Sequence, residues 1–168
     1  MPTLYFICYG NLCRSPFAEK YAALSASEPA HADWRFDGAG IGATRGHPCP
    51  KPAIAAAREV DVDLSSHLAK HTEEIHPGPE DWVIAMDRFV YGSLASTLGA
   101  PLSEVRGPGG SHLELMMHSL ANDPATSSIG LDVPDPMGQG IASYRDCYAL
   151  LIRAVDRLMR RISSEENQ

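Results

Sequence analysis

Strand-like and helix-like segments alternate over more than half of this 168-residue chain, and the alternation restricts the fold more than any other feature of the sequence. Short apolar runs predict strands at residues 3–8, 33–40 and 81–87, and stretches with helical spacing predict helices at residues 15–27, 51–63 and 88–99. This pattern is typical of an α/β fold, here a small three-layer sandwich with a central parallel sheet of about four strands flanked by helices. Ligands of such folds bind beyond the carboxyl ends of the strands, where Cys8 and Asp87 fall.

The second half of the chain is less regular. Residues 101–135 are rich in Gly, Pro, Ser and Asn, and within them the stretch HLELMMHSLA (112–121) predicts a short helix. A long terminal helix is predicted at residues 142–162, because apolar side chains at helical spacing share one face: Tyr144, Tyr148, Leu151, Val155, Leu158 and Ile162. We expect a single domain over residues 1–162 and a frayed tail over residues 163–168.

Composition excludes several classes of partner. No segment approaches the length of apolar sequence that a membrane helix needs. Lysine and arginine total 14 against 21 acidic residues, for a formal charge of −7, and no basic block suits nucleic acid. The start of the chain lacks the pattern of a signal peptide, which predicts a cytoplasmic protein whose four cysteines are thiols.

The strand–helix connection CYGNLCRSP (8–16) contains the residues of an anion-binding loop. Gly10 and Asn11 tolerate left-handed backbone, so the N–H groups of the loop can converge on one point, and the start of the next helix adds its own. Ser15 followed by Pro16 suggests the N-cap and first residue of that helix. The predicted phosphate-binding residues are Tyr9, Gly10, Asn11, Leu12, Cys13, Arg14 and Ser15.

Cys8 and Arg14 give this loop its chemistry. The planar guanidinium of Arg14 can hold two phosphate oxygens at once. Cys8 would lie under the anion, where the N–H groups, the helix dipole, Arg14 and the Ser15 hydroxyl all favour the thiolate. The residues therefore suggest that Cys8 is a nucleophile that attacks phosphorus. A nucleotide triphosphatase is not supported, because the G-x-x-x-x-G-K-[ST] loop is absent.

The same stretch resembles the signature of the low-molecular-weight protein tyrosine phosphatases, C-x-G-N-x-C-R-S-P, at every defined position. The resemblance continues through DGAGIGATRGHP, DVDLSSH, VIAMDRF and VPDPMGQGIASYRDCYALL, and is weak only over residues 101–129. It implies a protein tyrosine phosphatase that hydrolyses phosphate monoesters through a phosphocysteine. Its substrate would be a phosphotyrosine protein or a small aryl phosphate, its product inorganic phosphate, and a cognate tyrosine kinase is a partner that the resemblance allows.

The leaving group of a phosphate monoester needs a proton, and Asp135 is the candidate donor. An Asp between two prolines is by itself more typical of a turn, and the resemblance assigns it the role of general acid. Asp132 lies three residues earlier, but the D-P pair favours Asp135. No cofactor or metal is implied, and the seven histidines show no zinc-type spacing with cysteines.

Further residues receive roles through the resemblance. His67 would join Asn11 and Ser15 in a network that supports the loop, and Asp87 would face the loop as a structural carboxylate, as well as capping the helix that follows it.

Cys13 is five residues from Cys8, and a curled loop could bring the two sulfurs within range of a disulfide. The hypothesis is that oxidation forms a protective Cys8–Cys13 disulfide, which would make the enzyme redox-sensitive.

Three positions depart from the family pattern. Gly38 stands where a serine is usual, Met137 stands where an aromatic residue follows D-P, and the TRGHPCP loop lacks the aromatic residue of many relatives. The pocket wall would then consist of Tyr9, Leu12 and Met137, with Tyr9 as the replacement aromatic surface.

Three alternatives remain open. Arginine phosphatases of the same fold carry threonine at the position of Leu12, whose apolar side chain suits an aryl ring better. Thioredoxin-coupled arsenate reductases usually read R-S-Q and use a further cysteine pair, whereas Cys49 and Cys147 stand alone here. A phosphoanion-binding module without catalysis is the non-enzymatic alternative.

Overall fold

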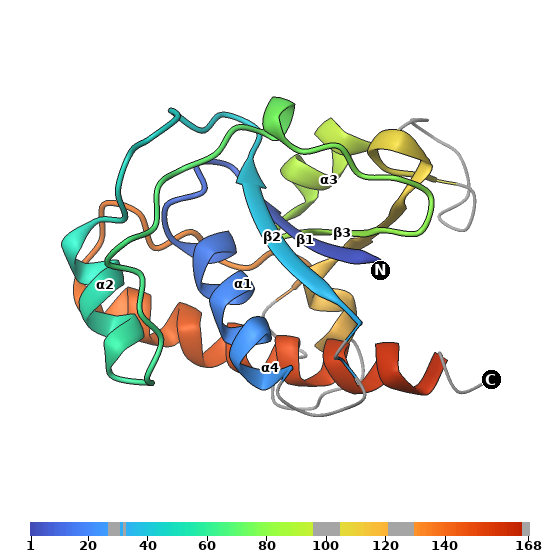
Figure 1. The fold of residues 1–168 in the computed structure, drawn as a ribbon. Coiled ribbons are helices and arrows are strands. Elements are labelled where there is room, and N and C mark those ends of the chain that lie inside the picture. Colours follow the sequence, from blue (N-terminus) through green and yellow to red (C-terminus); the bar gives the residue numbers. More distant parts are fainter. Residues whose placement is uncertain (27–30, 32, 96–104, 121–129, 166–168) are drawn as a thin grey trace.

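The computed structural model describes residues 1–26, 31, 33–95, 105–120 and 130–165. Its centre is a four-stranded sheet in the order β2-β1-β3-β4, in which every neighbouring pair is parallel. The strands are β1 (Thr3–Cys8), β2 (Arg35–Gly40), β3 (Trp82–Ala85) and β4 (His112–Leu115). The predicted parallel α/β sheet is therefore confirmed (Figure 1).

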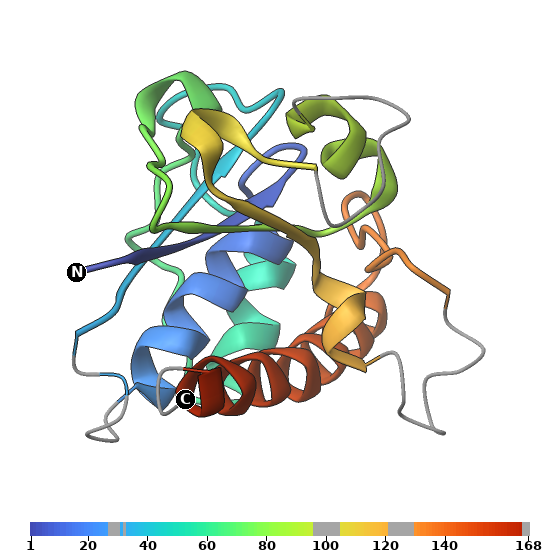
Figure 2. The ribbon, with the colours of Figure 1, turned by 90° about the vertical axis from the view of Figure 1, so that its right-hand side faces the viewer.

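Helices cover both faces of this sheet, as predicted for a three-layer sandwich. One layer holds α1 (Arg14–Ser25), α2 (Lys51–Arg58) and α4 (Ile141–Glu165), and the other holds α3 (Arg88–Leu94) (Figures 1 and 2). Alternate residues of β1 enter the two cores: Phe6 packs on the side of α4, and Ile7 packs on the side of α3 with Val90. Short 3-10 helices are found at Thr72–Glu74, Pro108–Gly110 and Met116–Leu120.

The terminal helix α4 buries the face that the sequence predicts. All six of its predicted apolar residues are buried: Tyr144, Tyr148, Leu151, Val155, Leu158 and Ile162. The Tyr148 ring stacks on Phe17 of α1, with centroids 3.9 Å apart, and its hydroxyl donates to the Cys13 carbonyl at 3.2 Å. Helix α4 therefore holds the start of α1 in place. It runs to Glu165, past the predicted end at Ile162.

The stretch 112–121 is not a helix as predicted, because it supplies the edge strand β4 and then the 3-10 helix Met116–Leu120. The positions of Leu113, Met116, Met117 and Leu120 are also compatible with the buried face of a helix. Parallel pairing with β3 decides in favour of a strand, and Arg161 of α4 pairs with the buried Glu114 carboxylate. Ala121 lies outside the described residues.

Helices α2 and α3 are shorter than predicted. Helix α2 ends at Arg58, shortly before Asp61 takes a left-handed conformation with φ of 61°. Helix α3 ends at Leu94, and residues 96–99 of its predicted span lie outside the described residues.

The strand order creates the edge at which the site forms. The chain leaves β1 toward β2 on one side and later returns to β3 on the other, so the carboxyl end of β1 lies at a topological switch point. Cys8 ends β1, and Asp87 follows β3 at the same edge. Within the described part of the chain, no helix has the length and apolar character needed to cross a bilayer.

Candidate active site

A pocket of about 270 Å³ opens at the carboxyl end of β1. Three segments line it: the loop between β1 and α1, the loop after β2, and the loop before α4. Its lining residues are Cys8, Tyr9, Gly10, Leu12, Cys13, Arg14, Gly42, Thr44, His47, Asp135 and Met137. The structure thus brings together the three predicted catalytic residues, Cys8, Arg14 and Asp135, from distant parts of the sequence.

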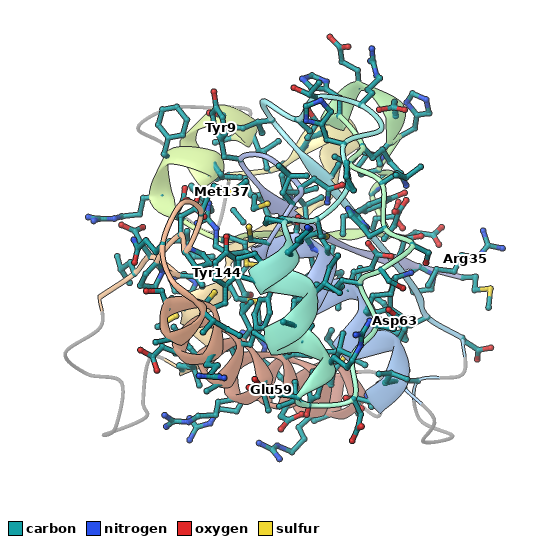
Figure 3. All side chains as sticks on the ribbon, turned by 90° about the vertical axis from the view of Figure 1, so that its left-hand side faces the viewer. Tyr9, Arg35, Glu59, Asp63, Met137 and Tyr144 are labelled. Carbon is teal, nitrogen blue, oxygen red and sulfur yellow. The ribbon has the colours of Figure 1, made fainter. Side chains whose placement is uncertain are left out.

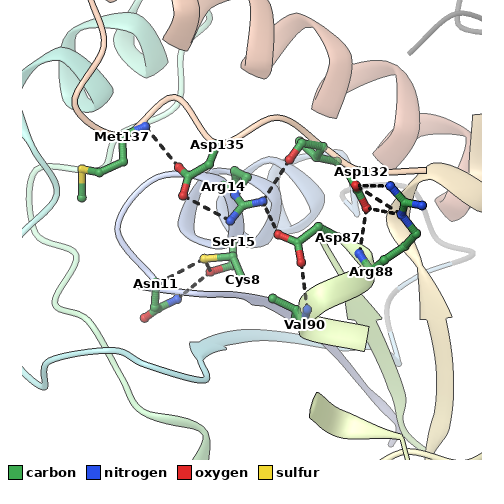
Figure 4. Close-up of polar contacts among 11 residues, drawn as sticks. Cys8, Asn11, Arg14, Ser15, Asp87, Arg88, Val90, Asp132, Asp135 and Met137 are labelled. Carbon is green, nitrogen blue, oxygen red and sulfur yellow. Dashed lines mark hydrogen bonds and ion pairs between the residues drawn. The ribbon is translucent and has the colours of Figure 1, made fainter. Parts of the chain in front are cut away.

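The Cys8 sulfur lies at the base of the pocket among hydrogen-bond partners. The Asn11 backbone N–H donates to Cys8 Sγ at 3.1 Å, and the Ser15 hydroxyl oxygen lies 2.9 Å from the same sulfur. Ser15 Oγ accepts a bond from Asn11 Nδ2 at 2.9 Å (Figure 4), and its own hydrogen has two acceptors within reach, the Cys8 sulfur at 2.9 Å and the Ala39 carbonyl at 3.5 Å. Donors aimed at sulfur favour the thiolate, which is the nucleophilic form of cysteine.

The segment that contains His67 and Lys70 forms hydrogen bonds with the loop between β1 and α1. Asn11 has φ of 53°, in the left-handed region, whereas Gly10 does not adopt the left-handed conformation that its residue type allows. The Asn11 side-chain oxygen accepts the Lys70 N–H at 2.8 Å, and the Asn11 carbonyl lies 2.9 Å from His67 Nε2. These bonds offset the strain of an unfavourable backbone conformation. His67 therefore contacts the loop where the resemblance placed it.

Helix α1 begins two residues earlier than the expected N-cap and first residue imply. Its first residue is Arg14 and its N-cap is Cys13, so Ser15 and Pro16 are not the N-cap and first residue. The Ser15 hydroxyl bonds to Cys8 and Asn11 instead, and no described side chain caps the helix. The N–H groups at a helix start, together with its positive dipole end, are suited to binding an anion.

The Arg14 guanidinium is buried and surrounded by acceptors. Its Nη1 donates to Asp87 Oδ2 at 2.7 Å and to the Val133 carbonyl at 2.9 Å, and its Nη2 lies 3.4 Å from Asp135 Oδ2 (Figure 4). Burial works to lower the pKa of Arg14, but the negative charges at Cys8, Asp135 and Asp87 outweigh it and raise that pKa. Arg14 therefore remains a fixed positive charge beside the Cys8 sulfur.

Asp87 has both of the predicted structural roles. One carboxylate oxygen binds Arg14, and the other accepts the Val90 N–H at 2.8 Å as the N-cap of α3. Because one side chain performs both tasks, the start of α3 and the orientation of the guanidinium are coupled.

The two aspartates before α4 differ in what they contact. Asp135 is about half exposed at the pocket, and its Oδ1 accepts the Met137 N–H at 3.1 Å. Asp132 instead pairs with the side chain and backbone N–H of Arg88, and these bonds lower its pKa (Figure 4). Of the two, Asp135 is therefore the carboxyl group that a molecule in the pocket can reach.

The outer wall of the pocket is mostly apolar. Figure 3 shows Tyr9 and Met137 at the same end of the molecule. Met137 Sδ lies 4.0 Å from Cys13 Sγ and 3.9 Å from the Tyr144 hydroxyl. Leu12 completes this side of the lining, so the three predicted wall residues do line one pocket.

The remaining cysteines differ from Cys8 in their surroundings. Burial raises the pKa of Cys13 to about 12, even though a contact with the Tyr144 hydroxyl acts in the opposite direction. Burial likewise raises the pKa of Cys49 and of Cys147 to about 12. These three thiols stay protonated near neutral pH. Over the described ranges, no cluster of three or more His, Cys, Asp or Glu side chains is arranged to hold a metal ion.

Comparison with known proteins identifies this arrangement. The family model described as low molecular weight phosphotyrosine protein phosphatase matches residues 3–168. The chain belongs to this family.

Two relatives from Bacillus subtilis are similar to this phosphatase-family chain over nearly all of its length. The low molecular weight protein-tyrosine-phosphatase YfkJ is 29% identical over 99% of both chains, and its crystal structure superposes with a TM-score of 0.74 over 100% of this chain and 98% of that one. A structure of the YwlE arginine phosphatase, a mutant with a phosphorylated active-site serine, has a TM-score of 0.70 at 24% identity and covers 95% of this chain and 94% of that one.

A third similarity covers only part of the chain. Arsenate reductase from Staphylococcus xylosus is 43% identical over 67 residues, which is 40% of this phosphatase-family chain and 46% of the reductase.

Several residues of the site in this phosphatase-family chain were not predicted from the sequence. Gly42, Thr44 and His47 line the pocket, and the backbone N–H of Lys70 positions Asn11. Gly40 has no space for a side chain: a Cβ there would lie 2.4 Å from the Tyr9 carbonyl and 2.8 Å from the Asn11 nitrogen. The closely spaced glycines of GAGIG are the signal that could have indicated this close packing.

The structure shows what lies next to Gly38, where the family usually has a serine. A Cβ at Gly38 would lie 3.0 Å from Glu19 Oε2, 3.1 Å from the Phe6 carbonyl and 3.4 Å from Asn11 Nδ2. The Glu19 carboxylate, whose pKa burial raises, therefore approaches the space that a serine side chain would need.

Gly40→Ala should damage the loop without unfolding the domain. The added methyl group meets backbone atoms of Tyr9 and Asn11, which cannot move independently of the loop. We expect inorganic phosphate to bind at least about tenfold more weakly and the free energy of unfolding to fall by about 1–3 kcal/mol. Phosphate titration by calorimetry and urea unfolding measure these two quantities. The control is Gly92→Ala in α3, where a Cβ meets no described atom within 4 Å. Its phosphate affinity should change little, and its free energy of unfolding should stay equal or rise by up to about 1 kcal/mol, because alanine favours a helix.

His67 should make stability depend on pH near neutrality. Burial lowers the pKa of His67, although the bond to the Asn11 carbonyl opposes the shift. Below the unfolded-state pKa of about 6.5, the unfolded chain takes up a proton that the folded chain resists, so stability is complete above that pH and falls as pH decreases through it. Urea unfolding from about pH 8 to about pH 5 should show a smaller loss for His67→Gln than for the wild type. An unchanged slope in His67→Gln, or an equal change in the exposed control His76→Gln, would contradict this assignment.

Proposed function

We propose that the chain is a protein tyrosine phosphatase that hydrolyses phosphate monoesters through a phosphocysteine on Cys8. The observation that carries the proposal is the meeting of the Cys8 thiol, the Arg14 guanidinium and the Asp135 carboxyl group in one pocket. A nucleophile, a fixed cation and a proton donor are the three groups that this reaction needs.

In the first step, the phosphate group binds above Cys8. Arg14 and the N–H groups of the loop hold its equatorial oxygens, and the Cys8 thiolate attacks phosphorus in line with the leaving oxygen. The S–P bond forms as the P–O bond breaks, and Asp135 gives its proton to the departing oxygen. Stabilisation of the equatorial oxygens is the largest contribution expected in phosphoryl transfer.

The second step releases inorganic phosphate. Asp135, now a carboxylate, takes a proton from a water molecule that attacks the phosphocysteine, and the S–P bond breaks. The Cys8 thiolate leaves with the Asn11 N–H and the Ser15 hydroxyl in place to stabilise it. The proposed cycle uses no metal ion and no cofactor.

The wall of the pocket supports an aryl phosphate as the substrate. Tyr9, Leu12 and Met137 offer apolar surface to a phenyl ring. A phosphoarginine would place a polar guanidinium against Leu12, whose side chain cannot form a hydrogen bond with it. Phosphorylated tyrosine in a protein is therefore the favoured substrate, although the YwlE relative is described as an arginine phosphatase.

Arsenate reduction is supported less well. The similarity to the Staphylococcus xylosus enzyme covers under half of either chain. A thiol relay must end in a cysteine pair that an external reductant can reach, but Cys49 and Cys147 are both only 4% exposed. We also propose a cytoplasmic location, a compartment in which cysteines are kept as thiols.

Hydrolysis of p-nitrophenyl phosphate in EDTA tests the proposed chemistry. We expect metal-independent turnover that Cys8→Ser abolishes and that Asp135→Ala reduces by about 10²-fold. The loss in Asp135→Ala should be larger with phenyl phosphate, because phenol is a poorer leaving group and depends more on protonation. Asp132→Asn is the matched control, since Asp132 pairs with Arg88, and it should retain most of the activity.

Two results would contradict the proposal. Turnover by Cys8→Ser would exclude the phosphocysteine, and no turnover by folded, reduced wild type would exclude an aryl phosphatase. Phosphoarginine hydrolysis and arsenate reduction would then be measured on the same preparation.

Oxidation provides a further test of the site. Hydrogen peroxide converts the Cys8 thiolate to a sulfenic acid and is reduced to water; Cys13 then attacks that sulfur, loses its proton and expels a second water, leaving a Cys8–Cys13 disulfide. In Cys13→Ser no disulfide protects Cys8, and excess peroxide oxidises its sulfenic acid further to sulfinic acid, which dithiothreitol does not reduce. We therefore expect activity lost to excess peroxide to return with dithiothreitol in the wild type and in Cys49→Ser, and to return far less in Cys13→Ser. Peptide mapping that finds only overoxidised Cys8 in the wild type would show that no such disulfide forms.

A further inference from the structure

Two aromatic side chains remain exposed beside the pocket. Tyr9 follows the nucleophile Cys8 and is 52% exposed, and Phe89 in the first turn of α3 is 69% exposed. Their ring centroids are 6.3 Å apart, with an angle of 42° between the ring planes. We call this pair the aromatic ledge. Tyr9 lines the pocket, so the ledge continues the pocket wall outward toward Phe89.

Core packing does not explain Phe89. Its neighbour Val90 is fully buried and joins α3 to the sheet, with Tyr91 and Leu94 packed against the same cluster. Phe89 is not a member of either core cluster, and Tyr9 is the ring that it approaches. Large apolar side chains that gather on the surface beside a pocket often mark a binding site.

The surrounding structure holds the ledge in a fixed position. The residue before Phe89 on the helix, Arg88, binds Asp132 through its backbone N–H and its guanidinium. The residue before that, Asp87, binds Arg14 and caps α3. The backbone that carries Phe89 is thus joined both to the phosphate loop and to the segment before the proposed acid.

Tyr9 is supported from behind by a glycine. A Cβ at Gly42 would lie 2.6 Å from Tyr9 Cζ and 2.9 Å from the Tyr9 hydroxyl oxygen, so the ring packs directly against the Gly42 backbone. A side chain at this position would force the ring to move. A ring held in this way loses little conformational freedom when a ligand packs on it.

We infer that Phe89, together with Tyr9, is a specificity residue that binds an apolar side chain next to the phosphotyrosine of a protein substrate. This inference rests on the proposed function. A phosphotyrosine ring in the pocket must continue into peptide that crosses the rim, and on this side the rim is aromatic. The basic group beside the ledge, Arg88, is already paired with Asp132, and the chain carries a formal charge of −7, so an apolar neighbour is favoured over an acidic one.

Steady-state kinetics on matched substrates test this inference. Two phosphotyrosyl peptide sets differ only in having Leu or Asp on either side of the phosphotyrosine, and p-nitrophenyl phosphate serves as a substrate without neighbours. We expect the wild type to prefer the Leu set in kcat/KM, and Phe89→Ala to reduce kcat/KM for that set by about fivefold or more. Activity of Phe89→Ala on p-nitrophenyl phosphate should stay within about twofold of wild type.

Two variants distinguish a direct contact between Phe89 and the peptide from a general disturbance of the protein. Phe89→Leu keeps an apolar side chain and should retain most of the preference for the Leu peptides. Leu24→Ala removes a similarly exposed apolar side chain, 57% exposed on α1 outside the pocket lining, and should change nothing. Equal effects of Phe89→Ala on both peptide sets, or a wild-type preference for Asp, would overturn the ledge as a specificity surface. If the wild type turned over none of these substrates, the proposed function itself would be overturned.

Discussion

Burial of the Arg14 guanidinium at the edge of the sheet is the interaction on which the rest of the site depends. A buried charge is costly unless several partners compensate it, and here the partners come from different segments: Asp87 after β3, and Val133 and Asp135 before α4. Each partner is far from Arg14 in sequence. Satisfying this one group therefore draws two distant segments to the end of β1, and one of them, the loop before α4, lines the pocket.

The same charge distinguishes the surroundings of Cys8, the proposed nucleophile, from those of the other three cysteines. Burial alone raises the pKa of a thiol, as it does for Cys13, Cys49 and Cys147. Cys8 is buried as well, but its sulfur meets the Asn11 N–H and the Ser15 hydroxyl and lies near the Arg14 charge. The loop thus offers positive potential to an anion although the chain as a whole is acidic.

The features predictable from sequence are those encoded by consecutive residues. The phosphate loop is contiguous, and the buried face of α4 is a local periodicity, so both were predicted from residue types alone. Strand β4 was missed because HLELMM fits either structure, and only pairing with the distant β3 decides between them. Gly40 and Gly42 were missed for a related reason: their importance lies in the loop residues that pack on them, which appear only in three dimensions.

The first turn of α3 is common to the proposed chemistry and to the inferred substrate preference. Asp87 orients Arg14 and also begins the helix, so a change that displaced this cap would disturb the cation and move Phe89 together. Arg88 and Asp132 couple the same turn to the segment that carries Asp135. The Phe89 side chain is 69% exposed and lies outside the pocket lining, so it can vary while the backbone that positions the proposed reacting groups is preserved. An outward-facing position on a turn held so firmly is one at which substrate preference can change without loss of the phosphatase chemistry that we propose.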